Sequence, residues 1–389
     1  MVCKSSGWTL VVIALSWTLV CHAEESGRQA KTLSMFQVVR FPNEPCSGDE
    51  VRNGTCYTAA ECEAKDGTNS GPCAGGFGIC CTFNLGCDSM SNENSTYFQS
   101  PTKTNEGTCR TKICKTNENI CQLRLDFFSF AIAGPKPPTD VVGANFLGED
   151  MATTGICAKD TFSVVNPGGT TPPVICGENG GEHMYVNFAS ECVDLIFDLG
   201  SGTDAEWSIR ISQYDCSYEN LAPSGCLQYL FGEDEGTIQS FNFKQDQHLA
   251  DQRQKVCIRR EINECEICYY YETKKDMRVS GAGDINDQCC GYGDDGSDAN
   301  EGGDCLIIPS LFYFDQDGEK LFAEESEFCG ADDNTFSDVY DEAKTVCSQR
   351  VPFQLTFLSD TYETTDEADP DADEPQRGFR IKYFMNGNC

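Results

Sequence analysis

Histidine is scarce in this chain, and basic residues are far fewer than acidic ones. The 389 residues include three histidines, 28 lysines and arginines, and 62 aspartates and glutamates, which give a formal net charge of −34. A chain this acidic repels nucleic acid and anionic lipid surfaces, so we expect neither as a partner. Most of the carboxylates are expected to form a solvated surface. The alternative is that some of them hold calcium, which prefers oxygen ligands.

Motifs for a catalytic histidine are also lacking. A Ser-His-Asp site needs a histidine held between an acid and a nucleophile. His22 lies in a predicted leader, and neither His183 nor His248 has a serine-protease motif around it. The segment 291–298, which holds the nearest lookalike of a nucleophile loop, has the wrong residue order. We therefore predict that the protein is not an enzyme, and that His183 and His248 have structural roles.

Long apolar runs are confined to the start of the chain. Lys4 precedes an apolar run over residues 10–20, and Cys21-His22-Ala23 follows it. This is the pattern of a cleavable signal peptide, so we assign residues 1–23 to a leader and residues 24–35 to a flexible polar lead. No later stretch approaches the roughly 20 apolar residues that span a bilayer. The sequence predicts a secreted, extracellular protein without membrane insertion.

Two N-glycosylation sequons agree with secretion. They are Asn53-Gly54-Thr55 and Asn94-Ser95-Thr96. In a secreted glycoprotein both are expected on exposed surface loops.

Cysteine, in contrast, is abundant. Two of the 26 cysteines, Cys3 and Cys21, lie in the leader, which leaves an even number in the mature chain. In an oxidising compartment these predict a framework of disulfides with no free thiol. A zinc site at Cys265-Glu266-Ile267-Cys268 is the alternative for one pair, but no second pair has zinc-ligand spacing, so disulfide bonding is preferred there.

Six cysteines lie close together in residues 36–86, between many glycines. A segment this small cannot bury enough apolar area to fold alone, so disulfides must stabilise it. Because it closes on Cys80-Cys81, it resembles the clip domain, a six-cysteine unit of arthropod secreted proteins. That resemblance implies three disulfides: Cys46–Cys80, Cys56–Cys73 and Cys62–Cys81.

After Cys81 the sequence consists of short runs in which apolar and polar residues alternate. Such period-two runs separated by turn residues predict β-strands, and helical periodicity is scarce. The runs lie at residues 123–127, 207–211, 238–243, 353–357 and 379–383. The sequence therefore predicts an all-β fold: the disulfide-rich N-terminal module followed by two β-sandwiches, over residues 87–216 and 217–389.

The two halves share an order of features. Each has an early cysteine, a strand that begins with a cysteine, and a Cys-Gly corner at 176–177 or 329–330, and the second half ends on a Gly378-Phe379 strand. This order resembles the CUB domain, a secreted β-sandwich. The resemblance implies the disulfides Cys87–Cys109, Cys157–Cys176, Cys226–Cys257 and Cys290–Cys329. It leaves ten cysteines without assigned partners: Cys114, Cys121, Cys192, Cys216, Cys265, Cys268, Cys289, Cys305, Cys347 and Cys389.

The CUB resemblance also implies a calcium site. In that family, carboxylates from separate loops converge at one end of the sandwich, and Asp304 and Asp360 match these positions in the second copy. Asp160 matches in the first copy, where Asp198 is only a distant second candidate. The family's glutamate has no clean counterpart. The residues that could replace it are Glu149 or Asp150 in the first copy and Asp284 or Asp287 in the second. The alternative is that all of these carboxylates are solvated loop residues.

The order of modules is similar to that of arthropod secreted CUB-domain proteins. The resemblance implies a non-enzymatic recognition protein with an extracellular protein partner, and calcium is the candidate cofactor. Two alternatives stay open: a catalytically inert cofactor of an extracellular protease cascade, and a structural component of the extracellular matrix.

Overall fold

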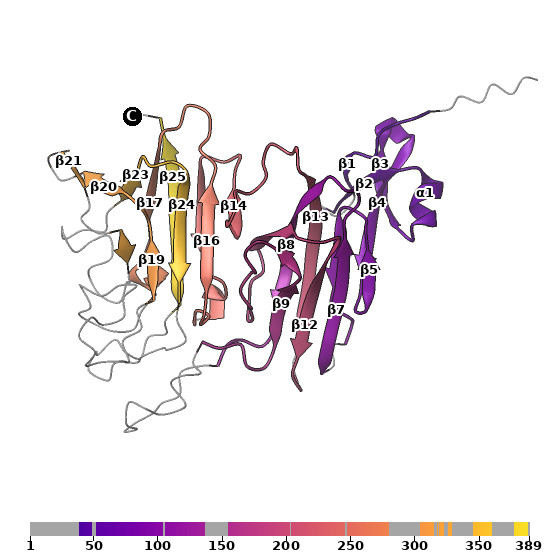
Figure 1. The fold of residues 1–389 in the computed structure, drawn as a ribbon, viewed down its shortest axis with the longest axis horizontal. Helices are drawn as coiled ribbons and strands as arrows, with labels where there is room; N and C mark the ends of the chain where they lie inside the picture. The colour runs from indigo at the N-terminus through magenta and orange to yellow at the C-terminus, as the bar shows by residue number, and fades with distance from the viewer. Residues whose placement is uncertain are drawn as a thin grey trace, which may run out of the picture. The chain divides into compact units, whose positions relative to one another are not determined.

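The structure is a computed structural model. It describes residues 39–48, 52–103, 106–136, 155–202, 204–245, 247–279, 304–314, 317, 319–322, 326–328, 345–359 and 377–387. The chain divides into one unit of residues 1–40 and a second of residues 41–389, and every strand below belongs to the second (Figure 1).

The N-terminal module is a small sheet with one short helix. Its strands are β1 (Pro45–Ser47), β2 (Asn53–Tyr57), β3 (Thr68–Cys73) and β4 (Gly78–Leu85), and its helix is α1 (Ala59–Ala64). Thr58 and Glu61 begin the helix with a reciprocal capping box. A small apolar core forms around Tyr57 and Phe83, which pack edge to face. Disulfides supply the stability that so small a core lacks.

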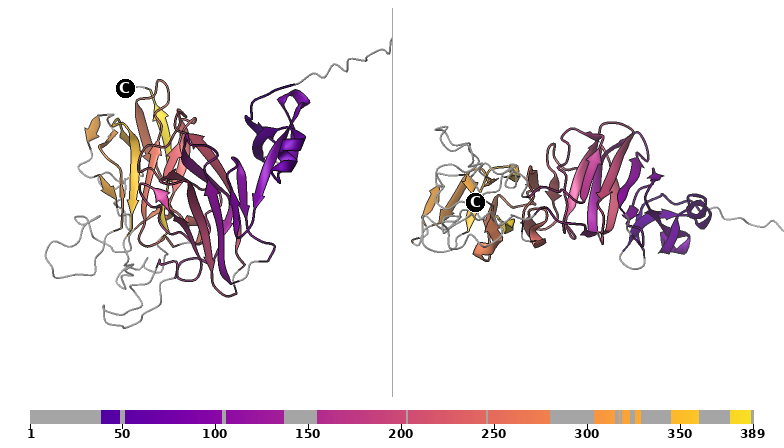
Figure 2. Two further views of the ribbon diagram at one scale, coloured as in Figure 1. Left: turned by 45° about the vertical axis from the view of Figure 1, so that its right-hand side comes forward. Right: turned by 90° about the horizontal axis from the view of Figure 1, so that it is seen from below.

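The first sandwich has two facing sheets. One has the strand order β6 (Thr96–Gln99), β13 (Glu206–Asp215), β8 (Ile120–Ala131), β11 (His183–Phe188) and β10 (Pro167–Gly168), and β4 joins its β6 edge in parallel. The other has the order β5 (Ser89–Ser91), β7 (Gly107–Cys114), β12 (Cys192–Leu199) and β9 (Thr161–Val165). Figure 2 shows these strands from two further sides.

The second sandwich is also built from two sheets. One has the order β14 (Gln228–Leu230), β16 (Arg253–Ile258), β24 (Phe353–Leu358), β19 (Cys305–Ile307) and β22 (Glu327–Phe328). The other has the order β15 (Glu235–Gln239), β25 (Gly378–Asn386), β17 (Glu266–Tyr270), β23 (Val346–Ser348), β20 (Leu311–Phe314) and β21 (Lys320–Phe322), with β18 (Met277–Arg278) pairing β25.

The two sandwiches share one topology. In each, the first strand of one sheet pairs in parallel with the second, as β5 does with β7 and β14 with β16. The last long strand of each copy lies in the opposite sheet, as β13 lies between β6 and β8, and β25 between β15 and β17. The prediction of an all-β chain with a disulfide-rich N-terminal module and two sandwiches is therefore confirmed.

Alternating residues fill the space between the sheets. In the first sandwich Phe98, Phe130, Phe162, Phe197 and Trp207 are almost fully buried, and the rings of Phe197 and Trp207 stack with centroids 3.9 Å apart. Along β24 of the second sandwich, buried and half-buried residues alternate without exception. Each such side chain stabilises the fold by roughly 1.5–3 kcal/mol through its burial.

One predicted strand is too long. Alternation predicts a strand over residues 238–243, but β15 ends at Gln239. Asn242 has a φ of 62° in the left-handed region, and a 3-10 turn over Phe243–Gln245 follows. Asparagine tolerates this conformation, which turns the chain out of the sheet.

Candidate functional site

Disulfides cross-link each of the three modules. The structure joins Cys46 to Cys80, Cys56 to Cys73, Cys62 to Cys81, Cys87 to Cys109, Cys157 to Cys176 and Cys226 to Cys257, the same pairs that the two resemblances imply. Cys290 and Cys329 lie outside the described residues. Membership of the N-terminal module in the clip family stays a prediction.

Three further disulfides join cysteines that the sequence left unassigned. They are Cys114–Cys192, Cys121–Cys216 and Cys268–Cys347. Cys265 and Cys305 are disulfide-bonded as well. Every cysteine of the described residues is therefore oxidised.

Cys265 and Cys268 do not form a disulfide with each other, because Cys268 is bonded to Cys347. The two cysteines are three residues apart, and on an extended chain such side chains point to opposite sides. The side chain of Cys268 faces Cys347 on β23. Glu266 lies near both of these sulfurs in a grouping that resembles a metal site. Because the sulfurs are in a disulfide, they cannot act as thiolate ligands.

Asp160 is a buried structural acceptor at one end of the first sandwich. It immediately precedes β9 and is fully buried. Its Oδ2 accepts the backbone N–H of Ala133, and its Oδ1 accepts the backbone N–H of Gly200, both at 2.8 Å. The carboxylate thus joins the chain that leaves β8 to the chain that leaves β12.

Asp304 holds the corresponding place before β19 in the second sandwich, and it is also buried. Its Oδ2 lies 3.1 Å from Nε2 of His248, a histidine with no exposed surface. The imidazole ring packs edge-on against Phe357, with centroids 5.7 Å apart. A nitrogen of this chain therefore faces the carboxylate where the CUB resemblance implies calcium.

The described residues do not fit a calcium ion. Calcium takes six to eight oxygen ligands. Each copy contributes one buried aspartate here, and both are engaged by N–H groups or an imidazole. Asp198 instead accepts a hydrogen bond from the Thr108 hydroxyl on an exposed part of β12. The other candidates, Glu149, Asp150, Asp284, Asp287 and Asp360, lie outside the described residues.

His183 lies in the contact between the two sandwiches. It begins β11 and is buried. Unprotonated, its Nε2 accepts the backbone N–H of Tyr229 at 3.1 Å, and the carbonyl oxygen of Tyr229 lies 3.2 Å from the same nitrogen. Burial, together with the nearby Arg124 guanidinium, lowers the pKa of His183 to about 4, so the ring is neutral at physiological pH. This environment suits a packing role.

Glu182 lies in the same contact between the two sandwiches. Its two carboxylate oxygens accept hydrogen bonds from the side-chain amides of Gln228 and Gln239, both at 2.8 Å. Burial raises the pKa of Glu182, and the two amide donors and Lys244 oppose that rise. Sequence reasoning missed this residue because its partners lie on two separate strands of the other sandwich.

The sequons do not lie on exposed loops. Asn53 is half-buried within β2. Asn94, before β6, donates from Nδ2 to the Gln213 carbonyl at 3.0 Å and accepts the Gln213 N–H at Oδ1 at 2.8 Å. The Asn94 amide thereby extends the pairing of β6 with β13. Glycosylation of both asparagines stays a prediction.

A family model matches the second sandwich. The family model for the animal CUB domain matches residues 223–386. No curated protein matches the chain. In the described residues, no helix is long and apolar enough to cross a membrane.

Solved structures are similar to this chain at low sequence identity. The CUB1-EGF-CUB2 domains of rat MASP-1 are 13% identical over 78% of this chain and 99% of that chain, with a TM-score of 0.22. The same region of human MASP-1/3 is 13% identical over 75% and 98%, also with a TM-score of 0.22. The full extracellular region of zebrafish Gpr126/Adgrg6 is 12% identical over 76% of this chain and 36% of that chain, with a TM-score of 0.24. By the family model, residues 223–386 of this chain are similar to the animal CUB domain.

Proposed function

We propose that this chain is a secreted, non-enzymatic recognition protein that binds an extracellular protein partner. The observation that carries the proposal is the CUB domain over residues 223–386. CUB domains are binding modules, and the first sandwich repeats the strand order of the second. Disulfide-bonded β-sandwiches of this kind present loops on a rigid scaffold, which is where binding residues concentrate.

Secretion is supported by the oxidised cysteines. All the cysteines among the described residues are in disulfides, which persist in oxidising compartments and are rare in the cytosol. The absence of catalysis is part of the proposal too. It is supported by the two histidines of the mature chain, both of which are buried in packing contacts.

Calcium has no part in the recognition that we propose. Asp160 and Asp304 are each engaged by other groups, so a calcium-bound loop face has no support from the described residues. The proposed binding should therefore occur equally in calcium and in chelator.

Affinity capture with the full chain tests the proposal. The tagged, secreted protein is incubated with extracellular fluid of the source animal, in calcium and in chelator, and bound proteins are identified. The matched control is the same protein after reduction and alkylation, which removes the disulfide framework. The proposal predicts a partner enriched only by the native protein. Equal enrichment by the reduced protein, or none by the native protein, would contradict it.

A further inference from the structure

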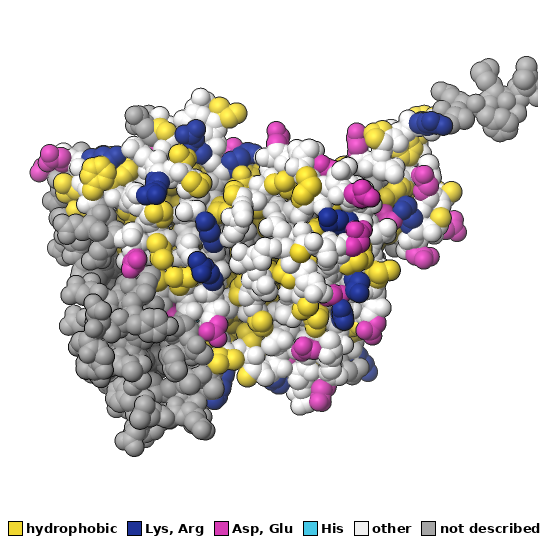
Figure 3. Space-filling view, viewed as in Figure 1, with side chains coloured by type: hydrophobic (Ala, Val, Ile, Leu, Met, Phe, Trp, Pro, Cys, Tyr) yellow, Lys and Arg dark blue, Asp and Glu magenta, His cyan; other side chains and the backbone are white. Residues whose placement is uncertain are grey.

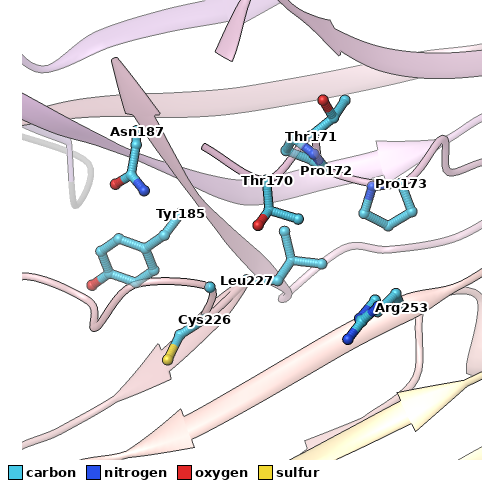
Figure 4. Close-up of a pocket in the computed structure, with 10 residues that line it drawn as sticks. Thr170, Thr171, Pro172, Pro173, Tyr185, Asn187, Cys226, Leu227 and Arg253 are labelled. Carbon is cyan, nitrogen blue, oxygen red and sulfur yellow. The ribbon is translucent and has the colours of Figure 1, made fainter. Parts of the chain in front are cut away.

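A small pocket lies where the two sandwiches meet. It is lined by the loop Thr170–Pro173, by Tyr185 and Asn187 of β11, by the segment Gly225–Leu227, and by Arg253 of β16 (Figure 4). Its free volume is about 30 Å³. One water needs roughly 10–15 Å³ by this measure, so the pocket has room for a group of a few atoms.

The lining residues offer hydrogen-bond donors. Asn187 Oδ1 accepts the Gln122 side-chain amide at 2.8 Å, which leaves its Nδ2 as the donating end. Thr170 and Thr171 are exposed and carry hydroxyl groups. Arg253 is exposed at the first position of β16, and within the described part of the chain its guanidinium has no ion-pair or hydrogen-bond partner.

Acidic side chains are absent from this lining, although the chain has 62 of them. Lys255 lies two residues beyond Arg253 and therefore projects from the same face of β16. The residues opposite these two on β24 are Leu358 and Thr356, which carry no charge. Figure 3 shows dark-blue side chains over β16, with few magenta ones beside them. Among the described residues, this is a local positive region on a strongly negative protein.

We propose that this pocket binds a carboxylate group. A guanidinium matches a carboxylate with two parallel N–H···O bonds, and the amide and hydroxyl donors supply further contacts. A carboxylate also suits the size of the pocket. The net charge of −34 repels polyanionic chains such as sulfated glycans over a long range, whereas a single carboxylate is repelled least. The carboxylate belongs either to an acidic amino acid or to an acidic sugar.

The site is independent of the protein binding proposed above, and small probes test it with the full secreted chain. Calorimetric titration is carried out with N-acetylneuraminate, with N-acetylglutamate amide, with the methyl ester of each, and with sulfate. The variants are Arg253→Gln, Arg253→Lys and the control Arg260→Gln. Arg260 is also exposed and follows the end of the same strand, so its replacement removes the same charge outside the pocket.

The proposal predicts that at least one carboxylate probe binds and that its methyl ester does not. Affinity should fall at least tenfold in Arg253→Gln, fall less in Arg253→Lys, and stay unchanged in Arg260→Gln. Binding of only the sugar or only the amino-acid probe identifies the source, and either result supports the site. Failure of both probes, equal affinity of Arg253→Gln and wild type, or tighter binding of sulfate would overturn it. Thermal melts confirm that each variant is folded.

Discussion

The backbone N–H of Tyr229 donates a hydrogen bond to Nε2 of His183 at 3.1 Å, and this bond joins the second sandwich to the first. The bond requires a neutral imidazole with an unprotonated Nε2. The stability of the contact therefore depends on the protonation state of one histidine.

Acidification is predicted to weaken this contact. Burial lowers the pKa of His183 from 6.5 to about 4, so the folded state disfavours the charged ring. The stabilisation is fully present above the unfolded value of about 6.5 and is lost as the pH falls towards 4, by up to about 3 kcal/mol. Urea unfolding of the wild type and of His183→Gln, across this pH range, measures it. The variant should lose most of this pH dependence. A wild type and variant with parallel pH profiles would contradict the assignment.

Removal of the Glu182 carboxylate should destabilise the same contact. Glu182→Ala leaves the amides of Gln228 and Gln239 without their acceptor, and the unsatisfied amide of the buried Gln228 alone costs about 1–3 kcal/mol. Glu178→Ala is the matched control, because its ion pair with Lys244 is exposed and should contribute less than about 1 kcal/mol. Denaturant unfolding compares the two variants. Equal losses in both would show that Glu182 does not hold the contact.

Asp160 is predicted to be a stability residue. Asp160→Ala deprives two amide groups, those of Ala133 and Gly200, of their acceptor, with an expected loss of roughly 2–5 kcal/mol. Asp198→Ala on the exposed end of β12 serves as the control and should change stability by less than about 1 kcal/mol. Thermal and urea unfolding measure the stability of both variants. An Asp160→Ala variant as stable as the wild type would refute the structural role.

Calcium should leave the melting temperature unchanged. A ligand that binds only the folded state raises that temperature by mass action. Because His248 faces Asp304 at 3.1 Å, we expect coinciding melts in millimolar calcium and in chelator. A calcium-dependent increase that disappears in Asp304→Ala would show instead that the aspartate is a ligand.

Free thiols should be absent from the mature protein. The described cysteines are all in disulfides, and the mature cysteine count is even. Intact-mass measurement after alkylation without reductant should show no added alkyl group. Incorporation of one group at high occupancy would contradict a fully paired framework.

Alternation in the sequence predicted five of the strands: β8, β13, β15, β24 and β25. Strands such as β24 and β25 have one buried and one more exposed face, and this produces the alternation from which they were predicted. The same pattern failed at Asn242, because alternation continues through a residue whose backbone has already turned out of the sheet. The conformation of a turn depends on the φ and ψ angles of its residues, and the spacing of apolar residues in the sequence carries no information about these angles.

Contacts between distant segments could not be predicted in this way. His248 and Asp304 meet because β16 and β19 both flank β24, and Glu182 meets Gln228 and Gln239 only where the two sandwiches touch. The cross-strand disulfides Cys114–Cys192 and Cys268–Cys347 depend on strand register in the same way. Cysteine spacing alone allows many pairings, so family resemblance was needed for the pairs that were assigned in advance.

Cross-linking mass spectrometry of the captured partner tests the central claim most directly. The complex of the native full chain with its partner is cross-linked, digested and mapped. If recognition resides in the CUB domain, cross-links should concentrate on loops within residues 223–386 and be unchanged in chelator. Cross-links confined to residues outside this range, or a complex that dissociates in chelator, would contradict calcium-independent recognition by the CUB domain.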